Sequence, residues 1–397
     1  MKIPRLFSPI LHHDTTSSFH CSINSLNIID VREVATQRDL AHFIKLPLAL
    51  YARDPYYVPQ LTRDMKVHFS SQNPFLRHAR VKFFLARRGG AVVGRIASII
   101  NPEHIERHGE RAGFFGFFES INDSAVADAL LNKVCDELSA EGMEIMRGPM
   151  NFSTNEECGF LIEGFDRPPM LMTPYNPPYY NAMVERFGMT KSKDLYAYIY
   201  DFEHTLPDKV LRVASLAEKK GVTVRAINMK RFMSDMRVFQ DVYNAAWEHN
   251  WGFLPLTDAE LSYSAQRLKP IVVPNLTFIA EKDGEPVGFL GLIPDFNVVL
   301  KQMKGRLTPL SIMKALYYSR KIPSLRLLLY GIKPEYRSRG VDALLFKEGH
   351  KNIAKRGSCR QIEFSWILED NTPVKRIAEL FGAALYKRYR IYEKKIT

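Results

Sequence analysis

The pattern of apolar and polar positions repeats one order of elements in the two halves of the chain. In each half, two apolar runs flank a short glycine-containing turn, which predicts a β-hairpin; the turns are Gly89-Gly90 and Asp283-Gly284. After each hairpin come a third strand, a helix, a fourth strand, a second helix and a last strand. Strands that alternate with helices after a hairpin predict an α/β fold with a mixed sheet, in the α+β sense.

The expected elements occupy matching places in the two halves. The third strands are expected at residues 114–119 and 327–332, and the helices that follow them at 125–141 and 342–355. The fourth strands are expected at 143–147 and 362–367, the latter with the alternation of a half-buried strand. Between the halves, residues 208–220 are expected to form a helix closed by Gly221.

Short sequence matches indicate a tandem duplication. Residues 84–94 and 278–288 share Phe-x-Ala, a glycine turn and Val-Gly, at an offset of 280 − 86 = 194 residues. Residues 185–188 and 379–382 share Glu-x-Phe-Gly at the same offset, 379 − 185 = 194. Matches in one register so far apart favour an internal repeat. We therefore divide the chain into a flexible arm at 1–27, a first copy at 28–204, a linker helix at 205–222 and a second copy at 223–397.

Composition narrows the classes of partner. The 397 residues carry a formal net charge of +12, which favours nucleic acid, an anionic membrane or a phosphate-rich cofactor, or is simply a solvated basic surface. No zinc-finger or RNP-like signature is present, so nucleic acid is not expected. The four cysteines fit no metal-ligand spacing, so no metal is expected. No apolar stretch reaches the roughly 18 residues of a membrane-spanning helix, and no signal-peptide core is present, which predicts a cytoplasmic protein.

The third strand of the second half leads into a basic turn, Arg337-Ser338-Arg339-Gly340, and the next helix begins at once with Val341-Asp342. A helix N-terminus presents unpaired N–H groups and partial positive charge, and a glycine lets the backbone approach an anion. The turn is therefore a candidate phosphate site. The alternative is a basic turn that only starts a helix.

Between its strand and its helix, this loop resembles the pyrophosphate loop of the GNAT superfamily of acyl-CoA-dependent N-acyltransferases. Asn371 and Phe381-Gly382 fall where that family has a cofactor-side asparagine and a final glycine turn. The resemblance covers both halves and implies two tandem GNAT-like domains with acyl-CoA as co-substrate. It also implies that the loop, the first helical residues and Asn371 contact the cofactor, and that its acyl-pantetheine arm is lined by Tyr330, Gly331 and Ile332.

Two positions of the second half depart from the GNAT pattern. Asp342 stands where a small residue is usual, and Ala378 stands where many members have a tyrosine that protonates the leaving thiolate. In the first half, residues 119–124 offer no glycine and carry two carboxylates at the place of the phosphate loop. We therefore expect a degenerate first copy and one acyl-CoA per chain.

Segments outside the phosphate loop narrow the resemblance. They are Gly148–Gly159, Gly164–Asp166, Tyr175–Tyr180 and Tyr243–Phe253. Together they resemble a tandem-GNAT group of bacterial proteins that includes the bacterial ceramide synthases. The resemblance implies transfer of a fatty acyl group from acyl-CoA to a sphingoid base or another lipid-like long-chain amine. The alternatives are acyl transfer to a soluble amine or amino acid, and a non-catalytic protein that binds acyl-CoA.

An amine attacks a thioester only as the neutral base, although a free alkylammonium is mostly protonated near pH 7. A carboxylate, a histidine or a water chain must therefore accept a proton, and backbone N–H groups must stabilise the oxyanion. The candidate bases are Glu248, His249, Glu363 and Glu369. The candidates for substrate contact are Asn151, Asn155 and Trp251. The alternatives for these residues are structural, such as a helix cap, a paired strand carboxylate or a turn residue.

The second half has extra residues between its hairpin and its third strand. Within them, between Pro309 and Pro323, apolar residues follow helical spacing: Leu310, Met313, Leu316 and Tyr317. Six basic residues accompany them: Lys301, Lys304, Arg306, Lys314, Arg320 and Lys321. Such a helix either lies in an anionic membrane interface or packs its apolar stripe on the sheet. The first alternative adds the anionic surface of the inner membrane to the expected partners and makes the protein peripheral there.

Overall fold

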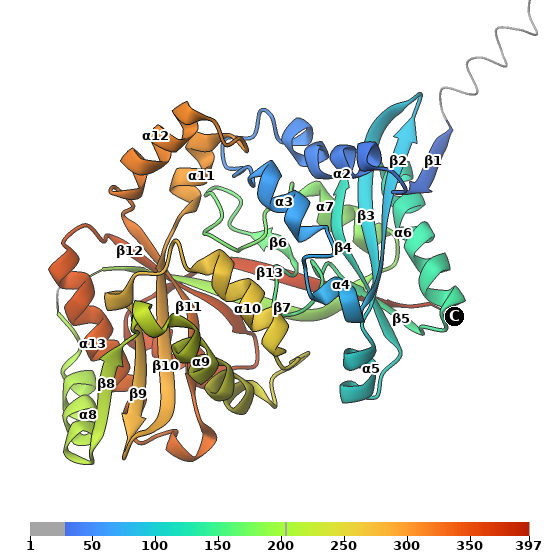
Figure 1. Ribbon diagram of the computed structural model, residues 1–397. Helices are drawn as coiled ribbons and strands as arrows, with labels where there is room; N and C mark the ends of the chain where they lie inside the picture. The colour runs from blue at the N-terminus through green and yellow to red at the C-terminus, as the bar shows by residue number, and fades with distance from the viewer. Residues whose placement is uncertain (1–27, 203–204, 397) are drawn as a thin grey trace, which may run out of the picture.

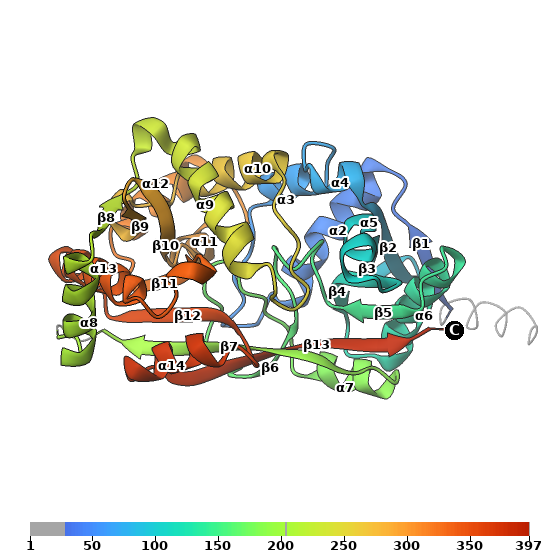
Figure 2. The ribbon, with the colours of Figure 1, turned by 90° about the horizontal axis from the view of Figure 1, so that it is seen from below.

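A computed structural model describes residues 28–202 and 205–396, and the arm expected at 1–27 lies outside the described residues. One mixed sheet of thirteen strands runs through both halves (Figures 1 and 2), in the order β1-β2-β3-β4-β5-β13-β7-β12-β11-β10-β9-β8, with β6 beside β13. The expected mixed α/β class is confirmed.

The first half contains these elements: β1 Ile29–Glu33, α2 Gln37–Leu50, α3 Thr62–His68, α4 Phe75–His78, β2 Arg80–Arg88, β3 Ala91–Ile100, α5 Pro102–His108, β4 Ala112–Ser120, α6 Ser124–Ala140, β5 Ile145–Gly148, β6 Phe160–Glu163, α7 Tyr179–Arg186 and β7 Thr190–Asp201. The second half contains α8 Asp208–Lys219, β8 Val222–Ala226, α9 Phe232–Trp247, α10 Asp258–Leu268, β9 Thr277–Lys282, β10 Glu285–Pro294, α11 Asn297–Met303, α12 Pro309–Ser319, β11 Ser324–Ile332, α13 Val341–Arg356, β12 Gln361–Leu368, α14 Thr372–Leu380 and β13 Ala384–Lys395. Short 3-10 helices join them at Met229–Arg231, Pro274–Leu276 and Pro334–Tyr336.

The hairpins of the two halves have the same register. Ala86 lies opposite Gly94 in β2–β3, and Ala280 lies opposite Gly288 in β9–β10. Both ladders also shift register next to the turn. The offset of 194 residues in the sequence is therefore also an offset between equivalent backbone positions.

The last strands of the two halves are exchanged, which the sequence did not predict. β7, which ends the first half, pairs with β12 of the second, and β13, which ends the chain, pairs with β5 of the first. β7 and β13 pair with each other along almost their whole length (Figure 2). A boundary between residues 204 and 223 thus separates the sequence repeats but not the two parts of the sheet.

In the second half, helices cover both faces of the sheet. Along β10, Phe289 packs with α9 and α10, whereas its neighbour Leu290 packs with α13 and α8 on the other face. Consecutive residues of a strand point to opposite faces, so a strand covered on both sides is apolar throughout. The helix expected between the halves is present as α8, and it packs against α13.

In the first half, the gap between the parallel strands β4 and β5 is filled by the chain itself. The two strands pair only at Ala112–Phe114 and Ile145–Arg147. Beyond that point, Met150 donates its N–H to the carbonyl oxygen of Phe115 (2.8 Å), and the Asn151 Oδ1 accepts the N–H of Phe117 (2.8 Å). This packing requires a glycine at position 116.

Gly116→Ala should destabilise the protein strongly, because the new Cβ would lie 1.9 Å from the carbonyl oxygen of Met150. Overpacking of this kind costs about 1–3 kcal/mol or more. The matched control is Gly291→Ala in β10, where the nearest atom to a new Cβ is 3.6 Å away. Urea denaturation of both variants checks the difference. An unchanged midpoint for Gly116→Ala would contradict the filled gap.

Candidate active site

In the second half, the corresponding parallel strands enclose a wedge. β11 and β12 pair only between Ser324–Leu327 and Gln361–Phe364. Past Leu327 and Phe364, no strand ladder among the described residues joins them, and β11 continues to Ile332. The wedge therefore opens toward the phosphate loop and the start of α13. Its edges carry backbone groups without a strand partner, which suits an extended ligand arm.

The N-terminus of α13 is free to bind an anion. Its N-cap is Gly340, with φ of 83°, and no side chain of the described residues caps it. The N–H groups of a first helical turn have no acceptor within the helix, so they face the loop. In the first half, α6 begins differently: Asp123 accepts the N–H of Ala125 (2.9 Å) and pairs with Arg88 (2.8 Å). That helix end already holds a carboxylate.

The predicted phosphate loop is anchored to α9. Arg337 donates through Nη2 to the carbonyl oxygen of Ala246 (2.5 Å), and the indole N–H of Trp247 donates to the carbonyl oxygen of Tyr330 (3.2 Å). Arg339 is exposed over the Tyr336 ring, and Ser338 is exposed with a positive φ. Arg337 thus fixes the loop, while Arg339 remains available to a ligand.

The other residues expected at the cofactor lie around this wedge. Gly331 and Ile332 are buried at the end of β11, Val341 is buried, and Asp342 is half-buried in the first turn of α13. The ring of Tyr330 lies near that of Phe346 in α13, with 5.4 Å between centroids. Asn371 caps α14 by accepting the N–H of Val374 (3.3 Å). Ala378, at the place of the family's tyrosine, is fully buried in the core beneath α14.

Two of the four candidate bases are exposed, and a third, Glu369, is half-buried in an ion pair. The Glu248 side chain is 59% exposed and lies 3.8 Å from Arg107. His249 follows it and is exposed. Glu369 pairs with Lys191 (2.5 Å) and accepts the N–H of Asp194. The structure therefore does not bring these three side chains together in the interior.

The fourth candidate, Glu363, is fully buried and already bound. It accepts hydrogen bonds from Ser365 Oγ (2.5 Å) and from the hydroxyl of Tyr386, and it lies 3.6 Å from Arg326 Nε. Arg326 in turn donates to the carbonyl oxygens of Leu171 (2.6 Å) and Met172, which belong to the first half. A buried carboxylate with a cation and two hydroxyl donors is well satisfied, so Glu363 joins the two halves.

Two neighbouring carboxylates that were not among the candidates are half-buried between the two halves of the chain. Glu156 and Glu157 are carried by the loop that fills the first-half gap, and both keep partial solvent access. Burial, with the adjacent Glu157 adding repulsion against the pull of Arg267, raises the pKa of Glu156 to about 7. Burial also raises the pKa of Glu157, against the pull of Arg326. Strongly perturbed, partly accessible acids are typical of functional sites.

The loop that carries this pair is clamped against the second half. Thr154 Oγ1 donates to the carbonyl oxygen of Gly252 (2.7 Å), and Asn155 accepts the hydroxyl of Tyr243 in α9 (2.5 Å). Asn155 also donates to the carbonyl oxygen of Leu254 (3.3 Å). Since Trp247 of the same helix bonds β11, the loop and the wedge share α9 as a wall. The sequence named Asn155 as a candidate for substrate contact but gave no signal for Glu156 and Glu157 beyond their place in the segment Gly148–Gly159.

The expected substrate residues have structural contacts. Asn151 and Asn155 hold the loop in place, as described above, and Asn151 also hydrogen-bonds Glu157. The Trp251 ring lies between two cations, 5.5 Å from Arg147 and 5.8 Å from Lys193. Asn151 and Asn155 therefore lie beside the Glu156–Glu157 pair.

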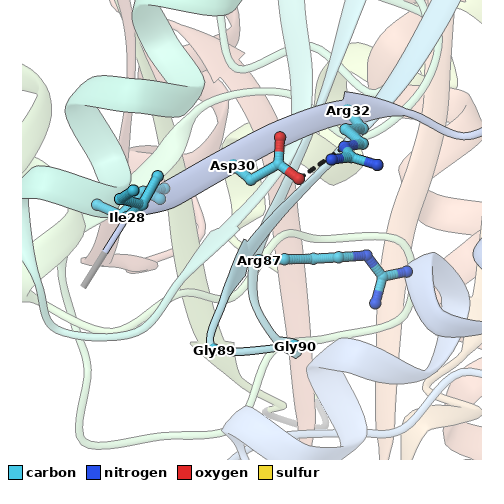
Figure 3. Close-up of a pocket in the computed structure, with 7 residues that line it drawn as sticks. Ile28, Asp30, Arg32, Arg87, Gly89 and Gly90 are labelled. Atoms are coloured by element: carbon cyan, nitrogen blue, oxygen red, sulfur yellow. Dashed lines mark ion pairs between the residues drawn. The ribbon is translucent and has the colours of Figure 1, made fainter. Parts of the chain in front are cut away.

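A hollow separate from the β11–β12 wedge lies beside β1, at the outer edge of the sheet in the first half (Figure 3). Its lining includes Ile28, Gly89 and Gly90, and its charged side chains are engaged: Asp30 pairs with Arg32 (2.6 Å), and Arg87 with Asp39 (2.9 Å). β1 and the β2–β3 turn form it, at the opposite end of the first half from the wedge. It brings no reactive group together.

Within residues 28–202 and 205–396, no cluster of three or more histidine, cysteine, aspartate or glutamate side chains is arranged to hold a metal ion. No helix in the same ranges is long and apolar enough to cross a membrane.

Comparison with known structures identifies the fold. No family model matches the chain. A tandem GNAT protein from the clavulanic acid biosynthesis pathway aligns with a TM-score of 0.55 at 12% identity, over 93% of this chain and 99% of the other. A GCN5-related N-acetyltransferase from Sphaerobacter thermophilus aligns with a TM-score of 0.51 at 13% identity, over 93% and 96%. The fold is therefore that of the tandem GNAT proteins, as expected.

Curated relatives define the family more closely. Protein YghO of Escherichia coli is 35% identical over 371 residues, which are 92% of this chain and 95% of that protein. The bacterial ceramide synthase of Caulobacter vibrioides is 34% identical over 375 residues, 92% of this chain and 97% of that enzyme. The chain belongs to the family of tandem GNAT-fold N-acyltransferases that includes this bacterial ceramide synthase. The expected resemblance is confirmed.

Gly340→Ala should destabilise the protein more than Gly357→Ala. These glycines flank α13 with φ of 83° and 67°, so both changes impose about 1–2 kcal/mol of backbone strain. Only at position 340 would the new Cβ lie 2.9 Å from the carbonyl oxygen of Val213 in α8, whereas nothing lies within 4 Å at position 357. Urea denaturation measures both losses. Equal losses would contradict the packing of α8 against the phosphate loop.

Proposed function

We propose that the protein transfers an acyl group from acyl-CoA to the amine of a lipid-like, long-chain acceptor. The observation that carries this is the open β11–β12 wedge leading to the uncapped N-terminus of α13. The diphosphate of CoA would bind the first N–H groups of α13 beside Arg339, and its pantetheine arm would lie in the wedge along Tyr330, Gly331 and Ile332.

We assign the deprotonation of the amine to the Glu156–Glu157 pair. Two adjacent carboxylates attract an alkylammonium, and an acid with a pKa near 7 is a stronger base than an exposed glutamate. After the proton moves to a carboxylate, the amine nitrogen attacks the thioester carbon. The C–N bond forms, the C–S bond breaks, and the CoA thiolate leaves and takes up the second proton that the amine nitrogen gives up as the amide forms.

The proposed class of amine acceptor is taken from the Caulobacter relative. The name of the Caulobacter enzyme as a ceramide synthase supports a sphingoid base or similar amine. A soluble amine or amino acid is the second candidate, and a non-catalytic acyl-CoA-binding protein is the third, favoured by the absence of the family's tyrosine at Ala378.

The deciding experiment incubates the protein with long-chain acyl-CoA and a panel of amines, with products identified by mass spectrometry. We expect an N-acylated long-chain base together with stoichiometric free CoA. Acylation of soluble amines alone would overturn the lipid acceptor. Binding of acyl-CoA without release of CoA from any mixture would overturn the activity itself.

Glu156→Gln and Glu157→Gln should each lower turnover by about 10²–10⁴-fold with unchanged acyl-CoA affinity. Glu248→Gln is the matched control: it removes an exposed carboxylate and should leave turnover near wild type. Because the base must be ionised, wild-type kcat/KM should rise with pH up to about 7 and then level off. Normal turnover in both interior variants, or a large loss in the control, would remove the pair from this role.

One acyl-CoA should bind per chain in a calorimetric titration, because α6 is capped by Asp123 and the first-half gap is filled. Arg339→Gln should weaken binding by about 10–100-fold through loss of a charged phosphate contact. Arg88→Gln, at the corresponding end of α6, should leave the affinity unchanged. Two equivalent sites, or equal losses in both variants, would contradict a single site at α13.

A further inference from the structure

Exposed apolar side chains concentrate on one short segment of the second half. Twelve large apolar side chains of the described residues are strongly exposed, and six of them fall between residues 307 and 317. They are Leu307, Leu310, Ile312, Met313, Leu316 and Tyr317, with exposures of 45–68%. Scattered exposed apolar residues are ordinary on a protein surface, but a contiguous patch marks a contact surface.

The exposure belongs to a helix whose other face is packed. Ala315 and Tyr318 of α12 join the core formed with α11, and Ser311 is buried. Thr308 and Ser311 form a capping box at the N-terminus of α12, and Pro309 stands in its first turn. The outer apolar face is therefore presented by an anchored helix. Figure 1 shows α12 at the outer edge of the molecule, beyond α11.

Positive charge surrounds this face. Residues 297–323 contain six basic side chains and no acidic one, so this segment contributes +6 of the net charge of +12. Lys304, Arg306, Lys314 and Arg320 are exposed, and none of the four forms an ion pair with a described residue. Lys321 lies over the Tyr317 ring, 4.0 Å from its centroid. Cations without acidic partners around an apolar face match a surface of anionic phospholipid headgroups.

We propose that α12 docks the protein on an anionic phospholipid bilayer. Leu310, Met313 and Leu316 enter the boundary between headgroups and acyl chains, and the flanking lysines and arginines contact lipid phosphates. An acidic protein surface would meet the cations but would leave the six apolar side chains without an apolar partner.

Docking through α12 orients the proposed active site. α12 precedes the start of β11 at Ser324, whereas the phosphate loop follows its end at Ile332. A strand of nine residues separates the two by about 30 Å. The CoA-binding end therefore stays in water, and the closed end of the wedge faces the lipid. This inference rests on the proposed function and extends it by bringing the protein to the bilayer that would hold a lipid amine, but the docking itself requires neither acyl-CoA nor turnover.

The first test is co-sedimentation of the full chain with vesicles of phosphatidylglycerol and phosphatidylcholine, or of phosphatidylcholine alone. We expect binding to the anionic vesicles only. Lys314→Glu/Arg320→Glu/Lys321→Glu should lower the partition coefficient by at least about 100-fold, at roughly fivefold for each lost cation. The matched control, Lys209→Glu/Arg212→Glu/Lys219→Glu on α8, should retain most of the binding. No binding by wild type, or equal losses in both triple variants, would overturn the proposal.

The second test reports the face that enters the lipid. Leu316→Trp should gain blue-shifted fluorescence that brominated lipids quench, and Met313→Asp should abolish sedimentation with a wild-type unfolding midpoint. Leu216→Trp on α8, a leucine of similar exposure, should stay unquenched. Unquenched Leu316→Trp would overturn the proposal. Self-association that Met313→Asp disrupts in lipid-free solution would do so too, since α12 would then be an interface between copies of the chain.

Discussion

Strands β7 and β13 run side by side through the centre of the sheet, although each belongs by sequence to the end of a different repeat. Their ladder extends from Thr190 to Ile199 on one strand, and each strand supplies the missing neighbour of the other half. At its centre, Arg390 binds Asp194 through two hydrogen bonds of 2.8 and 3.0 Å. Burial opposes the ionisation of Asp194, yet this pairing holds its pKa below the ordinary value. Because Asp194 is buried, removal of Arg390 would leave its carboxylate without a bidentate cation partner, so this pair stabilises the ladder that joins the two halves.

The two copies use the divergence of their parallel strands in opposite ways. In the first copy, Met150 and Asn151 close the gap, and Gly116 makes room for them. In the second copy, β12 is held by β7 on its outer side and pairs with β11 only as far as Phe364, so the wedge stays open. The segment that closes the first gap continues into the loop with Glu156 and Glu157. Through this loop the first copy brings two carboxylates against the second half, where Arg267 and Arg326 act on their pKa values.

The insert between β10 and β11 is held by both halves. Thr62 of α3 donates its N–H to the carbonyl oxygen of Gly305 (3.1 Å), and α11 shares a core with Val58 and Leu171 of the first half. The same region of the first half receives the hydrogen bonds of Arg326 from β11. The insert that carries α12 is thus fixed to both halves and to the strand that borders the wedge. The outer face of α12 is therefore a surface held in a defined place on the protein.

The sequence by itself determined the repeat and the order of the strands and helices that the two halves share, and it predicted a phosphate loop at 337–340, because each of these rests on local signals. Hairpin turns, helix caps and the glycine at 340 act over a few residues, and the offset of 194 residues is the same in the backbone. The basic amphipathic helix at 309–319 was predictable for the same reason. Only the tertiary structure decided which strands are neighbours. The local sequence of β7 and β13 does not show that each pairs with a strand of the other half. It also decided how far each carboxylate is desolvated: Glu248 is exposed and Glu369 is paired with Lys191, while Glu156 and Glu157 are half-buried by chain segments far away in the sequence. Desolvation depends on such distant contacts rather than on sequence neighbours, and here it raises the pKa of Glu156.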